Sequence, residues 1–218
     1  RTTVERMDHR TETIDHIRRA FAGTPHPGDD FLQGSREGRD AREAVEPFRG
    51  VADWAAVDPR VLDERYDALS FLSEGGFRFF APAYMVADLN DALDTADIVF
   101  HLTSGFHDVT VDMPVGDRVF RRRIGKSAFV NPRRYGAMTF EDYARYRLSV
   151  FSREEAGAIV RFLESKRPDA LDAAAIDAAL DSFWLARAAS APIQASLDQH
   201  VADEAAFIAA INPDDETT

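Results

Sequence analysis

Apolar residues recur every three to four positions along most of the chain, which is the spacing of one face of an α-helix. The pattern predicts helices over residues 10–23, 35–48, 59–72, 74–89, 139–148, 153–166, 170–188 and 191–211. Helix-start signals support this assignment at Asp58–Pro59, an N-cap before a first-turn proline, and at Ser152 and Glu155, which have the spacing of a capping box.

The segment FLSEGGFRFFAPAYM, residues 71–85, is unusually rich in aromatic side chains. Their helical spacing predicts a helix that has Ser73 as its N-cap and places these side chains in the core. Gly75 and Gly76 weaken a helix, so we expect a neighbouring element to approach them closely. Pro82 is expected to kink or interrupt the helix. The segment is too short to cross a membrane.

A different pattern follows in DVTVDMPV and RVFRRRI, two short runs rich in β-branched residues. Gly116 and Asp117 separate the runs, and a glycine at the first turn position suits a two-residue hairpin turn. The prediction is therefore a mainly α fold, a single compact multi-helix domain with a short β-hairpin around residues 108–124.

One domain of 1–218 is expected, because no linker or internal repeat divides the chain. We divide it into an N-terminal helical part (10–107), a basic hairpin or excursion (108–134), C-terminal helices (135–211) and an acidic tail (212–218).

The net charge is −12, and only two of the 26 basic residues are lysines. An excess of aspartate with little lysine indicates either a salt-loving host or a GC-rich genome. The absence of cysteine excludes disulfides, thiolate zinc sites and a cysteine nucleophile. No run approaches the ~18 apolar residues that cross a bilayer, and the N-terminal residues lack the apolar core of a signal peptide. We therefore expect a cytoplasmic protein that makes no contact with a membrane.

Catalytic and cofactor motifs give no assignment. The run IGKS (124–127) resembles the end of a phosphate-binding loop, but Phe120 stands where that loop needs a glycine. The serine motif of α/β-hydrolases is absent. His101 and His107 would be the first candidates for a metal, although a spacing of six matches no standard ligand pair. We therefore predict no catalytic residue, no metal site and no cofactor.

The clearest functional feature is electrostatic. Residues 118–147 include nine basic residues and only two acidic ones, Glu141 and Asp142. The net charge of this segment is therefore +7, and that of the rest of the chain is −19. Arginine with interleaved aromatic residues is typical of protein-binding hot spots and of phosphate and base contacts. The predicted binding residues are Arg121, Arg122, Arg123, Lys126, Arg133, Arg134 and Tyr135.

Several interpretations of this segment stay open. The basic residues could pair with the chain's own carboxylates, or bind a protein partner, or bind RNA or another polyanion. The negative remainder disfavours nucleic acid, so a non-catalytic interaction or regulatory protein is the preferred hypothesis. The alternative from a different class is a small hydrolase or ligand-binding protein with a pocket beside Trp54, Glu74 and Tyr84.

The run ALSFLSEGGFRFFAPAYM, preceded by FRGVADW, resembles the core signature of an uncharacterised prokaryotic protein family. In that family a tryptophan segment precedes a helix pair of the form fLs…fryflPaym, and the resemblance covers roughly residues 45–90. It implies a single compact, mainly helical domain and assigns no functional residue.

Overall fold

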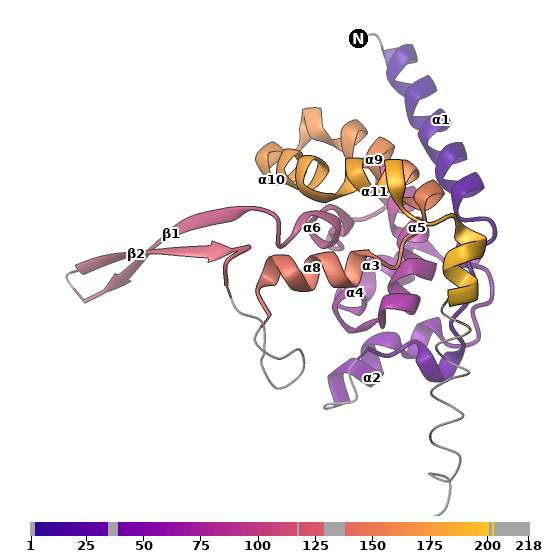
Figure 1. The fold of residues 1–218 in the computed structure, drawn as a ribbon, viewed down its shortest axis with the longest axis horizontal. Coiled ribbons are helices and arrows are strands. Elements are labelled where there is room, and N and C mark those ends of the chain that lie inside the picture. Colours follow the sequence, from indigo (N-terminus) through magenta and orange to yellow (C-terminus); the bar gives the residue numbers. More distant parts are fainter. Residues whose placement is uncertain (1–2, 35–38, 117, 129–137, 201, 203–218) are drawn as a thin grey trace, which may run out of the picture.

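The computed structural model describes residues 3–34, 39–116, 118–128, 138–200 and 202 (Figure 1). The fold is mainly α with one antiparallel hairpin, as the sequence predicts. The helices are α1 (Thr3–Ala20), α2 (Arg39–Val45), α3 (Pro59–Glu64), α4 (Ala68–Phe71), α5 (Glu74–Leu89), α6 (Ile98–Thr103), α8 (Phe140–Leu148), α9 (Arg153–Lys166), α10 (Ala173–Ala179) and α11 (Leu185–Ser190). The strands are β1 (Asp108–Val115) and β2 (Arg118–Gly125).

Helix α5 lies at the centre of the helical body and contacts α1, α3 and α6. Its aromatic side chains are buried and meet rings from other elements edge to face, among them Phe77 with Phe151 at 5.8 Å and Phe80 with Phe48 at 4.9 Å between centroids. Such ring pairs add to the free energy of burial. The prediction that most aromatic side chains of residues 71–85 lie in the core is confirmed.

The first turn of α5 packs against the preceding loop. The Ser73 side chain accepts a hydrogen bond from the Gly76 N–H and donates one to the Phe31 carbonyl at 2.5 Å. A Cβ at Gly76 would lie 2.9 Å from the Leu32 carbonyl oxygen, and one at Gly75 would lie 3.2 Å from Pro27. The predicted close approach is therefore present. Pro82 lies inside α5 without ending the helix.

Two predicted helices are interrupted in the structure. The helix expected over 59–72 is divided into α3 and α4, because the chain leaves helical geometry at Arg65, where φ is −109° and ψ is 45°. Tyr66, expected on the apolar face, is consequently exposed. The helix expected over 170–188 runs through α10 and α11 with a π-helical turn between them, at Leu180–Trp184. This turn places Phe183 and Trp184 together in the core.

The predicted start signals are confirmed. Asp58 caps α3, and Ser152 with Glu155 forms the capping box of α9. Thr139 and Asp142 form a second capping box that opens α8. Of the last predicted helix, residues 194–200 are helical. Ser35 and the acidic tail (212–218) lie outside the described residues.

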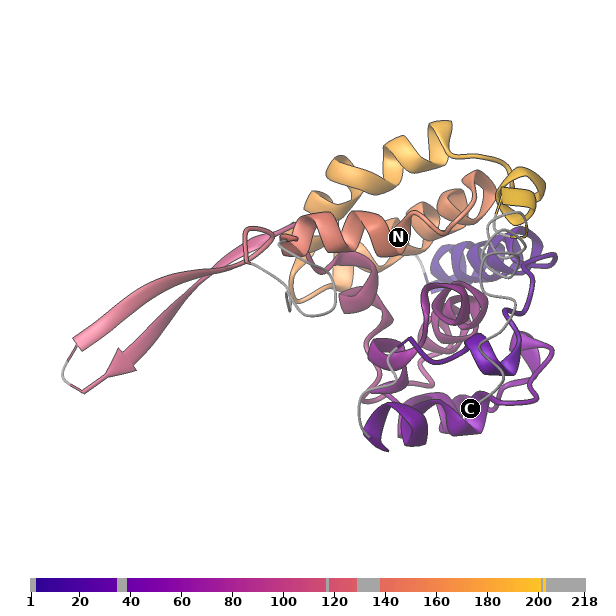
Figure 2. The same ribbon diagram turned by 60° about the horizontal axis from the view of Figure 1, so that its bottom comes forward.

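The hairpin extends from the helical body as a two-stranded arm (Figure 2). Hereafter "the arm" means residues 108–125. Gly116, at the tip, has φ +60°, the value that a two-residue hairpin turn requires at its first position. Within the described part of the chain, the helices are all too short or too polar to span a bilayer.

Candidate functional site: the arm

The register of the arm divides its side chains into two faces. Directly opposed residues of an antiparallel pair point to the same side, and successive residues alternate. Val111 opposes Arg122 and Met113 opposes Phe120 on one face, whereas Asp112 opposes Arg121 on the other. The first we call the apolar face (109, 111, 113, 115, 118, 120 and 122), and the second the polar face (108, 110, 112, 114, 119, 121, 123 and 125).

The apolar face is unusually exposed for its composition. The exposed fractions are 37% to 59% for its apolar side chains Val109, Val111, Met113, Val115 and Phe120. Side chains of this kind are normally buried in a folded protein, and a contiguous exposed group of them indicates a binding surface. The arm therefore presents apolar area that the helical body does not cover.

The arginines of the arm differ by face. On the polar face, Arg121 forms an ion pair with Asp112 at 3.1 Å and Arg123 lies 4.0 Å from Asp108. On the apolar face, neither Arg118 nor Arg122 has an ion pair with any residue that the structure describes. Two positive charges thus lie beside the exposed apolar side chains without internal compensation.

The remaining predicted binding residues are placed as follows. Lys126 is exposed just beyond β2. Arg133, Arg134 and Tyr135 lie outside the described residues. The basic residues of α8 belong to the body, because Arg145 pairs with Glu141 at 2.8 Å and Arg147 donates to the Leu69 carbonyl. Among the described residues, the basic side chains of this segment therefore do not form one continuous surface. The ion pairs of Arg121 and Arg123 are made within the arm.

Hydrogen bonds fix the root of the arm to helix α8. The Phe140 N–H donates to the Ala128 carbonyl at 2.7 Å, and the Glu141 N–H donates to the Lys126 carbonyl at 3.0 Å. On the opposite strand, the Asp108 carboxylate accepts a bond from the Ser127 hydroxyl. The direction of the arm is therefore set by the helical body.

A cavity of about 200 Å³ lies between α4, α6 and α8. His101 and Arg147 line it together with Ser70, Ser104, Phe140 and Tyr143. Burial and the nearby charge of Arg147 lower the pKa of His101 from 6.5 to about 4, so the imidazole is neutral at physiological pH. Among the described residues, no three histidine, aspartate or glutamate side chains are grouped so that they could hold a metal ion.

The residues of the predicted pocket have other roles. Trp54 is 7% exposed and donates its indole N–H to the Phe21 carbonyl. Tyr84 is fully buried, donates its hydroxyl to the Arg65 carbonyl and has a raised pKa because of burial. Both rings are parts of the core. Glu74 lies in the first turn of α5.

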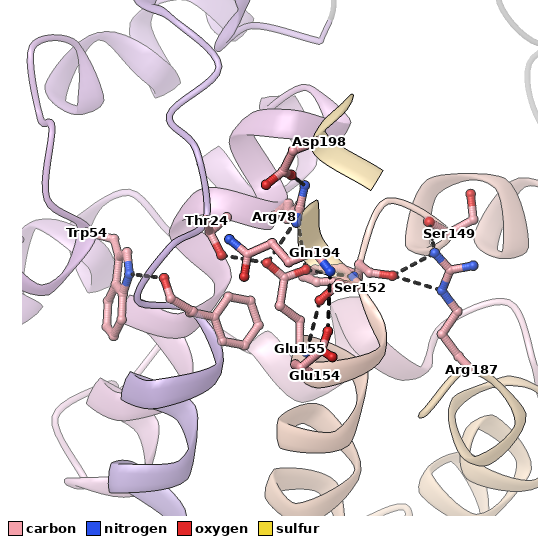
Figure 3. A network of polar contacts seen from close by, with 12 residues as sticks. Thr24, Trp54, Arg78, Ser149, Ser152, Glu154, Glu155, Arg187, Gln194 and Asp198 are labelled. Atoms are coloured by element: carbon pink, nitrogen blue, oxygen red, sulfur yellow. Dashed lines mark hydrogen bonds and ion pairs between the residues drawn. The ribbon is translucent and has the colours of Figure 1, made fainter. Parts of the chain in front are cut away.

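Sequence reasoning missed a buried ion pair between Arg78 and Glu155 (Figure 3). The Arg78 Nε donates to both carboxylate oxygens of Glu155, at 3.0 and 2.8 Å, and its Nη1 donates to Asp198 at 2.8 Å. Thr24 and the Ser152 N–H also donate to Glu155. The available signal was an arginine inside an apolar helix stripe, since a buried charge requires a partner.

A scan against protein-family models, a search of curated proteins and a search of solved structures each found no match to this chain. The resemblance to an uncharacterised family therefore stays a prediction, and the function must be argued from the geometry of the chain itself.

Proposed function

We propose that this protein is a binding module and that its arm docks on a second protein. The observation that supports this is the apolar face, where five apolar side chains at least 37% exposed lie beside Arg118 and Arg122. Buried in an interface, a side chain such as Phe120 contributes about 1.5–3 kcal/mol. The partner surface that fits is an apolar groove bordered by carboxylates, which would pair with the two arginines.

The electrostatic arrangement favours a protein over a nucleic acid. A nucleic-acid-binding ribbon needs a large excess of cations that reach phosphates, but three aspartates of the arm oppose its four arginines. On the apolar face, the five exposed apolar side chains offer a polyanion nothing with which to pair. The charge outside the arm is strongly negative and repels a long polyanion.

The test is affinity capture with variants matched by face. Met113→Thr with Phe120→Thr removes apolar side chains, whereas Asp112→Thr with Val119→Thr changes the polar face by the same number of residues. Threonine keeps a high strand propensity in both variants. We expect one protein to be captured by the wild type and the polar-face variant, and at least ~10-fold less by the apolar-face variant.

Three outcomes contradict the proposal. They are capture that does not depend on Phe120, capture of nucleic acid in place of protein, and no face-dependent capture at all. Thermal unfolding of both variants checks the fold, and because the altered side chains lie outside the core, both should unfold at the temperature of the wild type.

A further inference from the structure

The two-stranded arm has open backbone edges as well as faces. Each edge of a sheet carries N–H and C=O groups that can pair with a further strand. In the residues that the structure describes, the sheet consists of β1 and β2 alone, so both edges lack a neighbouring strand. The arm extends away from the described helices (Figures 1 and 2), which leaves these edges accessible.

The register indicates which residues direct their backbone outward. Two residues connect the strands. In a two-residue hairpin the pair that flanks the turn, here Val115 and Arg118, is a hydrogen-bonded pair, whose backbone groups point towards the other strand. Pairs alternate from there, so the outward backbone groups belong to the polar-face residues. On β1 these include Thr110, Asp112 and Pro114, and on β2 they include Val119, Arg121 and Arg123.

The two edges differ in chemistry. Pro114 has no N–H, so β1 lacks an outward donor near the tip. Proline is tolerated in a strand at such a position, where its nitrogen faces away from the neighbouring strand. Strand β1 also carries Asp108 and Asp112. The β2 edge contains no proline and four arginines. An incoming acidic segment is therefore attracted to β2 and meets aspartates along β1.

We propose that the partner adds an extended segment to the β2 edge, and that this segment alternates apolar and acidic residues. This inference rests on the proposed function and specifies how the partner binds. Apolar residues of the segment would extend the apolar face beside Phe120, and acidic residues would lie next to Arg121 and Arg123 on the polar face. The β2 strand of a second copy does not suit this edge, because pairing β2 with β2 places arginines beside arginines.

The probe is a fluorescein-labelled heptapeptide of alternating valine and glutamate, titrated with the full chain and followed by fluorescence anisotropy. We expect saturable binding, and no binding of the same peptide with lysine in place of glutamate. If the glutamate peptide does not bind, or if it binds no better than the lysine peptide, the inference is wrong. A duplex oligonucleotide that binds more tightly than the peptide also overturns it.

Proline substitutions on opposite edges distinguish edge pairing from docking on a face. Val119→Pro removes an outward N–H from β2, and Thr110→Pro removes one from β1, while the bonds within the hairpin are retained in both. Edge pairing on β2 predicts at least ~10-fold weaker peptide binding for Val119→Pro. Thr110→Pro and the side-chain control Val119→Ala should stay close to the wild type.

The outcomes separate this inference from the proposed function. If Val119→Pro binds the peptide as well as the wild type while Phe120→Thr loses binding, the arm docks through its face and the edge proposal is wrong. If Thr110→Pro is the weaker variant, the segment adds to β1, which also contradicts the proposal. Loss of partner capture by the apolar-face variant tests the proposed function independently of the peptide.

Discussion

At the scale of single residues, the most constrained group is the Arg78–Glu155 pair. The side chains are 4% and 0% exposed, and the pair joins α5, α9 and the helix at 194–200. Removing Arg78 leaves the buried Glu155 carboxylate without its paired cation, and removing Glu155 leaves Arg78 with Asp198 alone. Loss of one member of a buried pair costs about 3–5 kcal/mol. Replacing both members with apolar residues removes the desolvation cost as well as the attraction.

We therefore predict that Arg78→Met and Glu155→Leu each lower the free energy of unfolding by about 3–5 kcal/mol, and that the double variant loses less than their sum. Urea denaturation measures all three. The exposed pair Arg10–Asp91 is the control, because Arg10→Ala there should cost under about 1 kcal/mol. Strict additivity of the Arg78 and Glu155 effects would show that the two charges do not depend on each other.

His101 predicts a pH dependence of stability. In the unfolded chain it binds a proton near pH 6.5, but in the folded chain only near pH 4, so between these values the unfolded state binds more protons. The free energy of unfolding therefore keeps the full contribution of neutral His101 above pH 6.5 and decreases as the pH drops towards 4, by about 2 kcal/mol at pH 5. We expect His101→Gln to lose less stability than the wild type between pH 7.5 and 5. Equal losses in urea denaturation would contradict the prediction.

At the scale of elements, glycines in two helices predict opposite effects of the same substitution. Alanine is preferred to glycine inside a helix by about 1 kcal/mol. A Cβ at Gly157 in α9 meets nothing within 4 Å, whereas one at Gly76 in α5 meets the Leu32 carbonyl at 2.9 Å. Gly157→Ala should raise the free energy of unfolding by about 0.5–1 kcal/mol, and Gly76→Ala should lower it by about 1–3 kcal/mol.

Urea denaturation of these two variants measures both changes. A stabilising effect of Gly76→Ala would show that the loop before α5 moves aside at little cost.

Sequence patterns predicted elements where the determining signals are local. Helical periodicity and the Ser73 and Ser152 caps placed α5 and α9, and the runs on either side of Gly116 placed the arm. The division of α3 from α4 was not predicted, because residues 59–72 contain neither glycine nor proline after Pro59 to mark it.

Only part of the candidate site was predicted, because the pairing of its side chains depends on contacts between residues that are distant in the sequence. The arginines of β2 were visible in the sequence, but which of them pair depends on the register across the turn, which places Arg121 opposite Asp112 and Arg122 opposite Val111. Arg78 and Glu155 are 77 positions apart, so only the tertiary fold, in which α1 contacts both α5 and α9, brings them together.

At the scale of the whole molecule, the charge is distributed unevenly. The chain carries −12, but the arm carries four arginines against three aspartates and is slightly positive. Close negative charges in the body repel one another and oppose folding, whereas the charges of the arm attract an acidic partner. Salt screens both interactions, so it should stabilise the folded body and weaken binding by the arm.

We therefore predict opposite responses to sodium chloride in the same protein. Between 0.1 and 1 M the Debye length falls from ~10 to ~3 Å, so the melting temperature should rise by about 2–4 °C for each kcal/mol of repulsion removed. Over that range the valine–glutamate peptide should bind at least ~5-fold more weakly.

Unfolding on dialysis to low salt would further support a salt-adapted host. A melting temperature indifferent to salt would show that the acidic surface is too dispersed to oppose folding, and salt-independent peptide binding would show that the arm binds through its apolar side chains without its arginines.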